Sequence, residues 1–204
     1  MTEAELKMML LNYMSSYPDY CMDGFIILVL AAGNSANPHG VSGNYVFKDG
    51  DIILMDFGAY CRGYWSDITR CLFLGHVGNP ELEKIYHIVH QANLAALAKV
   101  KPGVAAREID AAARSVIEEA GYGELFLHRT GHGLGLSVHE EPYITSANDL
   151  ILEEGMVFTI EPGIYISGIG GVRIEDDVLV TKDGYRTFTK WSKELEDNII
   201  KYDK

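Results

Sequence analysis

"GDIILMDFGAY" (residues 50–60) and "GMVFTIEPGIY" (residues 155–165) are two versions of one sequence pattern. The stretches align without a gap, and the corresponding positions are Gly50 with Gly155, Asp56 with Glu161, Gly58 with Gly163 and Tyr60 with Tyr165. Each stretch reads as a buried strand that carries one carboxylate among apolar residues. Because burying an unpaired carboxylate costs on the order of several kcal/mol, the repeated acid needs a partner.

Each of these strands is followed by a second acid. Asp67 comes after Asp56 with a predicted turn at 61–63, and Glu175 comes after Glu161 with a predicted turn at 168–171. In antiparallel hairpins with these turns, the two acids of each pair would lie opposite each other or nearly so. Like charges in that arrangement destabilise a hairpin, so we expect positive charge between them.

Two sources of positive charge are open. Arg70 and Arg173 lie close enough in sequence to pair with the acids, but they would leave nearby histidines without a role. Two divalent ions would balance four carboxylates, and ions bridged by carboxylates at about 3.5–4 Å are the layout of two-metal hydrolytic sites. The sequence therefore favours a metal site, with Mn²⁺ or a similarly hard ion suiting the carboxylate ligands best.

A nitrogen ligand is expected from "HRTGHGLGLSVHEEP" (residues 128–142). His132 stands between Gly131 and Gly133, which we interpret as clearing space around the imidazole. The alternative is a flexible glycine-rich loop with solvated histidines. The remaining histidines, at positions 76, 87 and 90, read as ordinary structural or surface residues, and His39 in "NPHG" has a weak signal alone.

The length and composition of the chain exclude several kinds of protein. A chain of 204 residues with 48% hydrophobic residues fits one sizeable domain, and the net charge of −12 argues against nucleic acid as a partner. The three cysteines, Cys21, Cys61 and Cys71, are too few for a disulfide framework, so we expect a reducing, cytoplasmic location. The apolar run 24–33 is too short to span a membrane and lacks a preceding positive charge, so it reads as a buried strand and not as a signal peptide.

Periodicity predicts a mixed α+β domain. Helices are expected at 6–14, 80–100 and 105–121, the first preceded by a capping box formed by Thr2 and Glu5. Strands are expected at 26–32, 51–60, 66–74, 156–166 and 172–181. The internal repeat covers the two hairpins, and the helices show no matching repeat.

The motifs "DFGAYCRGYWSDITR", "HRTGHGLGLSVHEEP", "FTIEPGIY" and "GVRIEDDVLVT" occur in an order that resembles the pita-bread metallopeptidases. This family includes methionine aminopeptidases, prolidases, aminopeptidase P and creatinase. The resemblance covers nearly the whole chain and implies a pita-bread fold of two halves with duplicated β-hairpins and helices.

The resemblance also implies site residues and a metal requirement. The family's five metal ligands fall on Asp56, Asp67, His132, Glu161 and Glu175. They would hold two divalent ions, most readily Mn²⁺, with Co²⁺, Fe²⁺ or Zn²⁺ as alternatives. His39, His128 and His139 would surround the substrate, and Arg173 would support Glu175.

In the implied mechanism, Glu161 accepts a proton from the attacking water, and His128 and His139 donate hydrogen bonds to the oxyanion or hold the substrate backbone. His39 lines the leaving-group side, and the free amino terminus of a short peptide faces the metals and Asp67. Neither a membrane nor nucleic acid is an expected partner, and a homodimer is compatible with the pattern.

The "HRTGHG" and "VRIEDD" forms favour the proline-specific branch, which means an Xaa-Pro dipeptidase or Xaa-Pro aminopeptidase. Methionine aminopeptidase remains an alternative, as does a non-catalytic domain that binds peptides or proteins. We expect residues 1–204 to form a single catalytic domain, without the amino-terminal domain usual in that branch.

Overall fold

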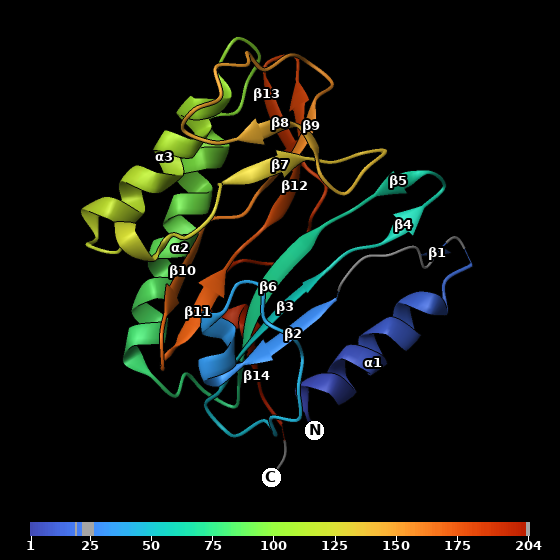
Figure 1. Cartoon of the computed structure of the whole chain (residues 1–204), viewed down its shortest axis with the longest axis vertical. Coiled ribbons are helices and arrows are strands. Elements are labelled where there is room, and N and C mark those ends of the chain that lie inside the picture. Colours follow the sequence, from blue (N-terminus) through green and yellow to red (C-terminus); the bar gives the residue numbers. More distant parts are fainter. Residues whose placement is uncertain (19, 22–26, 203–204) are drawn as a thin grey trace.

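Each of the two stretches of the repeated pattern contributes a strand to its own sheet, and the two sheets lie beside each other in the middle of the molecule (Figure 1). The computed structural model describes residues 1–18, 20–21 and 27–202. The first sheet has the order β14-β6-β3-β2, with bounds β2 (Leu28–Ala31), β3 (Ile52–Phe57), β6 (Ile68–Leu74) and β14 (Ile199–Ile200). The second has the order β13-β12-β9-β7-β8, with bounds β7 (Gly131–Gly133), β8 (Glu140–Ile144), β9 (Val157–Ile160), β12 (Asp176–Thr181) and β13 (Gly184–Thr187).

In each half the chain leaves its sheet as a two-stranded arm and then returns. The first arm consists of β4 (Tyr60–Cys61) and β5 (Tyr64–Trp65), and β1 (Tyr20–Cys21) pairs with β4. The second arm consists of β10 (Gly163–Ile166) and β11 (Gly170–Arg173). The duplicated hairpin is thus confirmed, and both halves follow the order strand, arm, strand.

Three of the four long strands expected in these hairpins, 51–60, 156–166 and 172–181, are each broken in two, whereas 66–74 is observed as β6 alone. At one break Glu161 is followed by Pro162, which has no N–H group to donate to a sheet. At the tip of the first arm, Arg62 and Gly63 have positive φ angles of 51° and 95°, and the turn lies where it was predicted. The breaks matter because the acids of the pattern sit at them.

Three helices surround the sheets: α1 (Glu3–Ser15), α2 (Pro80–Lys99) and α3 (Ala106–Glu119). The predicted capping box is confirmed, since Thr2 and Glu5 bond reciprocally at the start of α1. Short 3₁₀ turns complete the described chain: η1 (Ala32–Ala36), η2 (Gly123–Leu125) and η3 (Glu196–Asn198). The apolar residues at helical spacing on α2 and α3 are buried, except Val116, which is half-buried; the buried ones are Leu82, Ile85, Val89, Ala92, Ala96, Ile109, Ala113 and Ile117.

The first sheet has a core on each face. Along β3, Ile52 and Leu54 join the large core shared with α2 and α3, whereas Ile53 and Met55 join a smaller core under α1. This alternation is the period of two expected of a strand that is buried on both faces. Asp56 lies on the same face of β3 as Ile52 and Leu54, the face toward the large core. Its side chain therefore points toward the place where the two halves of the chain meet.

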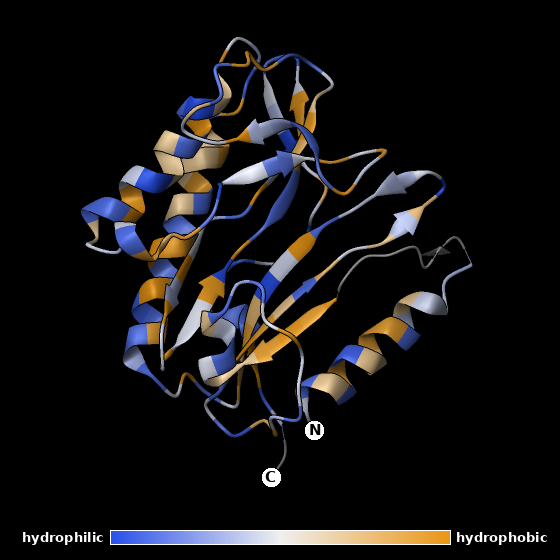
Figure 2. Cartoon of the chain, viewed as in Figure 1, coloured by the Kyte–Doolittle hydropathy of each residue, from blue (hydrophilic) through white to orange (hydrophobic). Residues whose placement is uncertain are grey.

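The apolar run 24–33 contributes β2, whose residues are mostly hydrophobic (Figure 2). Val29, Leu30 and Ala31 are buried, as predicted, whereas residues 22–26 lie outside the described part of the chain. None of the helices that the structure describes combines the length and apolar character needed to cross a membrane.

Candidate metal centre

The four acids of the repeated pattern lie where the arms join the sheets. Asp56 and Glu161 stand where the chain leaves β3 and β9, and Asp67 and Glu175 stand just before β6 and β12. Thr69 is the residue directly opposite Asp56, and Asp176 is opposite Ile160. The acids of each pair are therefore near neighbours across the hairpin and not direct partners.

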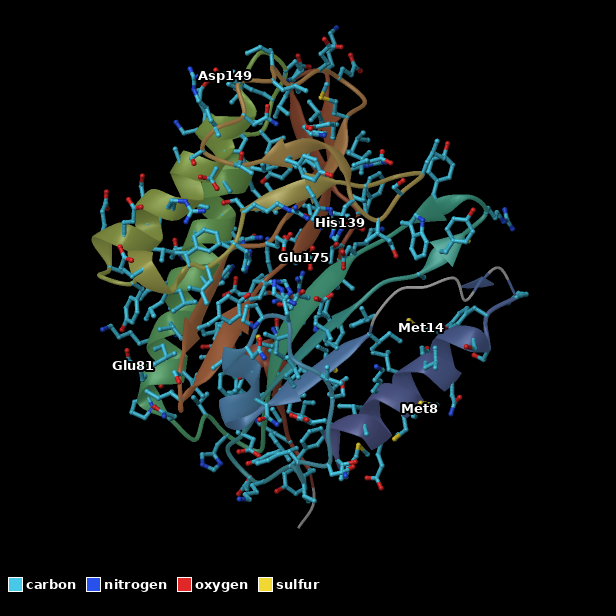
Figure 3. The ribbon with its side chains drawn as sticks, viewed as in Figure 1. Met8, Met14, Glu81, His139, Asp149 and Glu175 are labelled. Carbon is cyan, nitrogen blue, oxygen red and sulfur yellow. The ribbon has the colours of Figure 1, made fainter. Side chains whose placement is uncertain are left out.

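Three of the five expected ligands form a tight cluster. Asp67, His132 and Glu175 each offer a ligand atom within 4.8 Å of the others, and all three residues are buried. Glu161 adjoins the cluster, with its Oε1 3.5 Å from His132 Nε2, and Asp67 Oδ2 lies 3.7 Å from the same nitrogen. Residues from both halves of the chain therefore meet at one point, between the two sheets, where Glu175 and His139 are labelled in Figure 3.

His132 is oriented for ligation by its own strand. Its Nδ1 lies 3.1 Å from the carbonyl oxygen of Gly133, which accepts the ring proton and leaves the Nε2 lone pair facing the acids. The flanking glycines have a different purpose from the one expected. A Cβ at Gly131 would meet Thr159 O at 1.8 Å, and one at Gly133 would meet Glu141 O at 2.3 Å. They let β7 approach β9 and β8 closely; they do not clear space around the imidazole.

The buried carboxylates of the cluster and its neighbour Glu161 would be stabilised by a bound cation. Burial, together with the neighbouring carboxylates, raises the pKa of Asp67 and of Glu175 well above the ordinary values. Burial also raises the pKa of Glu161 to about 7, with Asp56 adding to the effect. Asp67 Oδ1 is buried and has no hydrogen-bond partner among the described residues. An orphaned carboxylate oxygen amid like charges, beside an imidazole lone pair, fits a divalent metal ion.

Asp56 differs from the other acids because an arginine pairs with it. Its Oδ2 accepts a hydrogen bond of 2.5 Å from Arg173, so the arginine alternative applies to this one acid. Arg70 is fully buried and forms its ion pair with Asp176 at 2.6 Å; it contacts Glu175 by donating to its backbone carbonyl oxygen at 2.6 Å. Three carboxylates thus remain without an arginine pair of this kind.

Arg173 reaches its expected neighbour Glu175 through Thr69. The arginine Nε donates to Thr69 Oγ1 at 3.0 Å, and that hydroxyl donates to Glu175 Oε2 at 2.6 Å. Arg173 also donates to the Tyr165 hydroxyl at 2.9 Å. One guanidinium therefore organises acids from both halves.

His128 lies beside the site with both ring nitrogens engaged. Its Nε2 is 2.7 Å from the Tyr165 hydroxyl, and its Nδ1 is 2.7 Å from Arg129 O. Because Arg173 already donates to Tyr165, the phenol proton points to His128 Nε2, which acts as the acceptor. Burial, followed by the charge of Arg173, lowers the pKa of His128 to about 3. The donor role expected for His128 toward a substrate would require Tyr165 to release it.

The other two expected histidines are exposed and flank the cluster. The ring of His139 meets that of His132 edge to face, with the centroids 4.2 Å apart. His39 lies near enough to His128 to contribute to the lowering of its pKa. Asp67, His132 and Glu175 form the tight cluster, and the other six expected site residues are connected to it or to one another by the contacts and charge interactions described above.

Sequence reasoning missed several supporting residues. Thr69 and Tyr165 connect Arg173 to Glu175 and to His128, and Asp177 Oδ2 accepts from the backbone N–H of Asp67 at 3.1 Å. Tyr165 occurs in the repeated pattern, which was a usable signal. Thr69 and Asp177 carry no such signal, because their partners lie more than a hundred positions away, at separations of 106 and 110 residues.

Comparisons with known proteins agree with this geometry. Residues 1–182 match the model of metallopeptidase family M24. The chain is 49% identical to an Xaa-Pro dipeptidase of Lactobacillus helveticus over 175 residues, which cover 85% of this chain and 47% of that protein. It is 48% identical to an Xaa-Pro dipeptidase of Pyrococcus horikoshii, over 82% of this chain and 48% of the relative. The chain thus spans about half the length of these curated relatives.

A solved structure extends the likeness to three dimensions. The Xaa-Pro dipeptidase from Bacillus anthracis superimposes with a TM-score of 0.93 at 46% identity, covering 98% of this chain and 55% of that one. The pita-bread fold and the resemblance stated from the motifs are confirmed. The family match implies a requirement for divalent metal, which the cluster fits. The chain belongs to metallopeptidase family M24.

Proposed function

We propose that this chain carries the catalytic centre of an Xaa-Pro dipeptidase, a metallo-exopeptidase that hydrolyses the bond between an amino-terminal residue and proline. The observation that supports it most is the buried cluster of Asp67, His132 and Glu175 with its orphaned carboxylate oxygen. The names of the relatives supply the substrate class, because both curated relatives described above are Xaa-Pro dipeptidases.

Asp56, Asp67, His132, Glu161 and Glu175 would hold two divalent ions. When bound, such ions polarise a carbonyl and bring the pKa of a water molecule toward neutrality. We favour Mn²⁺ over Co²⁺, Fe²⁺ and Zn²⁺, because four of the five ligands offer carboxylate oxygens. The hydrogen bonds from Thr69 and Gly133 keep Glu175 and His132 pointed at the centre.

Glu161 is the general base of the proposal. Its carboxylate adjoins His132, and it receives a weak hydrogen bond of 3.4 Å from Thr159. It takes the proton of the attacking water and delivers it to the nitrogen that leaves. Arg173 fixes the orientation of Asp56, and its charge opposes the effect of burial on the pKa of Glu161 and of Glu175.

The exposed histidines set the substrate side. His139 stands against His132 and donates to the carbonyl oxygen as negative charge develops there, whereas His39 lines the leaving-group side. The free amino terminus of a short peptide lies against the acids, Asp67 among them, which gives the exopeptidase character. His128, which is hydrogen-bonded to Tyr165, fixes the side of the proposed substrate site on which these histidines lie.

Two further properties complete the proposal. Cys61 and Cys71 are free thiols, which suits a cytoplasmic protein. A homodimer is compatible with the proposal, and light scattering at two protein concentrations tests for it. Methionine aminopeptidase activity and non-catalytic binding of peptides or proteins are the alternatives that the following assay separates.

The test is hydrolysis of Leu-Pro, Leu-Pro-Gly and Met-Ala-Ser by the Mn²⁺-loaded protein, with a chelator-treated sample as the control. Chelator-sensitive cleavage of Leu-Pro alone supports the dipeptidase, and cleavage of Leu-Pro-Gly would move the proposal to an Xaa-Pro aminopeptidase. Preference for Met-Ala-Ser would overturn the proline specificity. Metal binding by elemental analysis without any cleavage would leave a binding domain as the function.

A further inference from the structure

Glu3 is a fully buried carboxylate that lies outside the metal centre. Its Oε1 accepts hydrogen bonds from Ala31 N at 2.7 Å and from Asn34 Nδ2 at 3.1 Å, and its Oε2 accepts from Gly43 N at 2.8 Å. These donors lie 28 to 40 positions further along the chain. The proposed catalytic machinery does not use Glu3, so its burial needs another explanation.

The carboxylate is well supported where it stands. Glu3 is the first residue of α1, where the free N–H groups of the helix favour negative charge. The helix itself is fixed to the same region, because Ala4 N donates to Gly43 O at 3.0 Å and Glu3 N donates to Tyr45 O at 3.2 Å. Hydrogen bonds to an ionised acceptor are roughly twice as strong as neutral ones. Glu3 is thus a rigid anchor for the chain that surrounds it.

The anchored chain is the loop that runs from the end of β2 to Gly43 and carries His39. Glu3 holds both ends of this loop and, through Asn34, one point within it. The loop begins under strain, since Ala32 has a φ of 47°, a left-handed conformation that costs free energy for a residue with a Cβ. Such a conformation persists only where the surroundings fix it.

A second acid does the same for the other half of the chain. Asp110, on α3, is fully buried and accepts from Thr130 Oγ1 at 2.7 Å and from both Nε and an Nη of Arg114 at 3.1 Å. Arg114 in turn donates to His128 O at 3.1 Å. In both cases, therefore, a buried acid on a helix fixes a loop bearing a histidine beside the site.

We propose that Glu3 is a positioning residue that fixes the loop 32–43 and, through it, the place of His39 in the substrate pocket. Its effect on turnover rests on the proposed function, whereas its effect on the loop does not. Glu3 is not among the residues proposed to touch substrate or metal, so its effect on turnover passes through the loop that it holds.

The first experiment needs no turnover. In Glu3→Gln the amide N–H₂ group would face one of the three donors, so the loop loses at least one charge-assisted bond. Hydrogen exchange followed by mass spectrometry should show residues 31–43 exchanging about tenfold faster, and the imidazole NMR signal of His39 should shift. The matched control is Glu5→Gln, which removes a carboxylate that bonds to Thr2 from the same helical turn. Unchanged exchange in Glu3→Gln, or an equal change in Glu5→Gln, would overturn the proposal.

The second experiment tests the path through His39 with a double-mutant cycle on Leu-Pro hydrolysis. Glu3→Gln should lower kcat/KM about tenfold in the native chain and have little further effect in a His39→Ala background. Equal losses in both backgrounds would show that Glu3 acts by another route and would overturn the proposal. If the native protein does not cleave Leu-Pro, the proposed function fails, and the exchange and NMR results still decide the role of Glu3.

A second variant with a smaller structural effect keeps the proposal testable if Glu3→Gln does not fold. Asn34→Ala removes only the side-chain donor on the loop and leaves the buried carboxylate with its two backbone partners. It should produce a smaller change of the same sign in the exchange of residues 31–43 and in the His39 signal. No change in either quantity would count against the proposal even if Glu3→Gln does not fold.

Discussion

The two arms have the same topology and opposite surroundings. The arm β4–β5 is largely exposed: Tyr64 at its tip is 64% accessible, and Cys61 is exposed. The arm β10–β11 is buried: Ile164 and Val172 are inaccessible and belong to the large core. The buried arm delivers side chains to the candidate centre, namely Tyr165 and Arg173.

The difference shows how a duplicated pattern acquires two roles. Both arms begin and end at acids, so both halves supply the acids of the candidate centre. The buried arm adds a cation and a phenol that fix Asp56 and His128, because low accessibility holds these groups in one arrangement. The side chains of Cys61 and Tyr64 in the exposed arm lack this constraint of burial.

The largest effect is expected for the acid that begins the buried arm. Glu161→Gln keeps the size of the side chain and removes its ability to take a proton, so kcat for Leu-Pro should fall by about 10³-fold or more. Circular dichroism should report an unchanged fold. Turnover within a few-fold of the native value would remove Glu161 from its role as general base.

The acid that begins the exposed arm should govern metal binding. Asp56→Asn keeps an acceptor for Arg173 and loses the ligand charge, so metal affinity should weaken by about 100-fold or more. Elemental analysis after dialysis against a graded chelator measures it. Full metal occupancy in the variant would contradict the assignment of Asp56 as a ligand.

A matched pair of tyrosines compares the arms directly. Tyr165→Phe removes the hydroxyl between Arg173 and His128, which should cost about 1–3 kcal/mol of unfolding free energy and lower kcat/KM about tenfold. Tyr60→Phe, at the corresponding position of the exposed arm, should change the unfolding free energy by about 0.5 kcal/mol or less. Urea denaturation of both variants tests the contrast, and equal losses would show that burial does not distinguish the arms.

The smallest effect concerns acid stability. His128 takes up a proton near pH 6.5 when unfolded but only near pH 3 in the folded chain, because it is buried beside Arg173. Its contribution to stability is therefore complete above pH 6.5 and is lost as the pH falls from 6.5 toward 3. His128→Gln removes this loss, so its unfolding free energy should decline between pH 7.5 and 5 by about 2 kcal/mol less than that of the native chain. Parallel declines would mean that His128 protonates freely in the folded protein.

The sequence predicted the duplicated hairpins and the position of every acid in the cluster, because strand periodicity and the cost of a buried charge are both local signals. It also predicted the helices from their apolar spacing. The breaks in the strands were not predicted, since a local pattern does not show where a strand leaves a sheet. Glu3 was missed for a similar reason. It reads as an ordinary acid at the start of a helix, and only the fold brings the amides of Ala31 and Gly43 to it.

The hydrogen bonds around the candidate centre also bear on the order of folding. Thr69 with Glu175, Asp67 with Asp177, and Arg173 with Asp56 each join residues separated by 106 to 117 positions. Contacts of such long range require most of the chain entropy to be lost before they can form. We therefore expect the helices and the separate hairpins to form first and the centre to assemble last, as the two halves dock. A half cut away from its partner would then keep its acids and lose the groups that orient them.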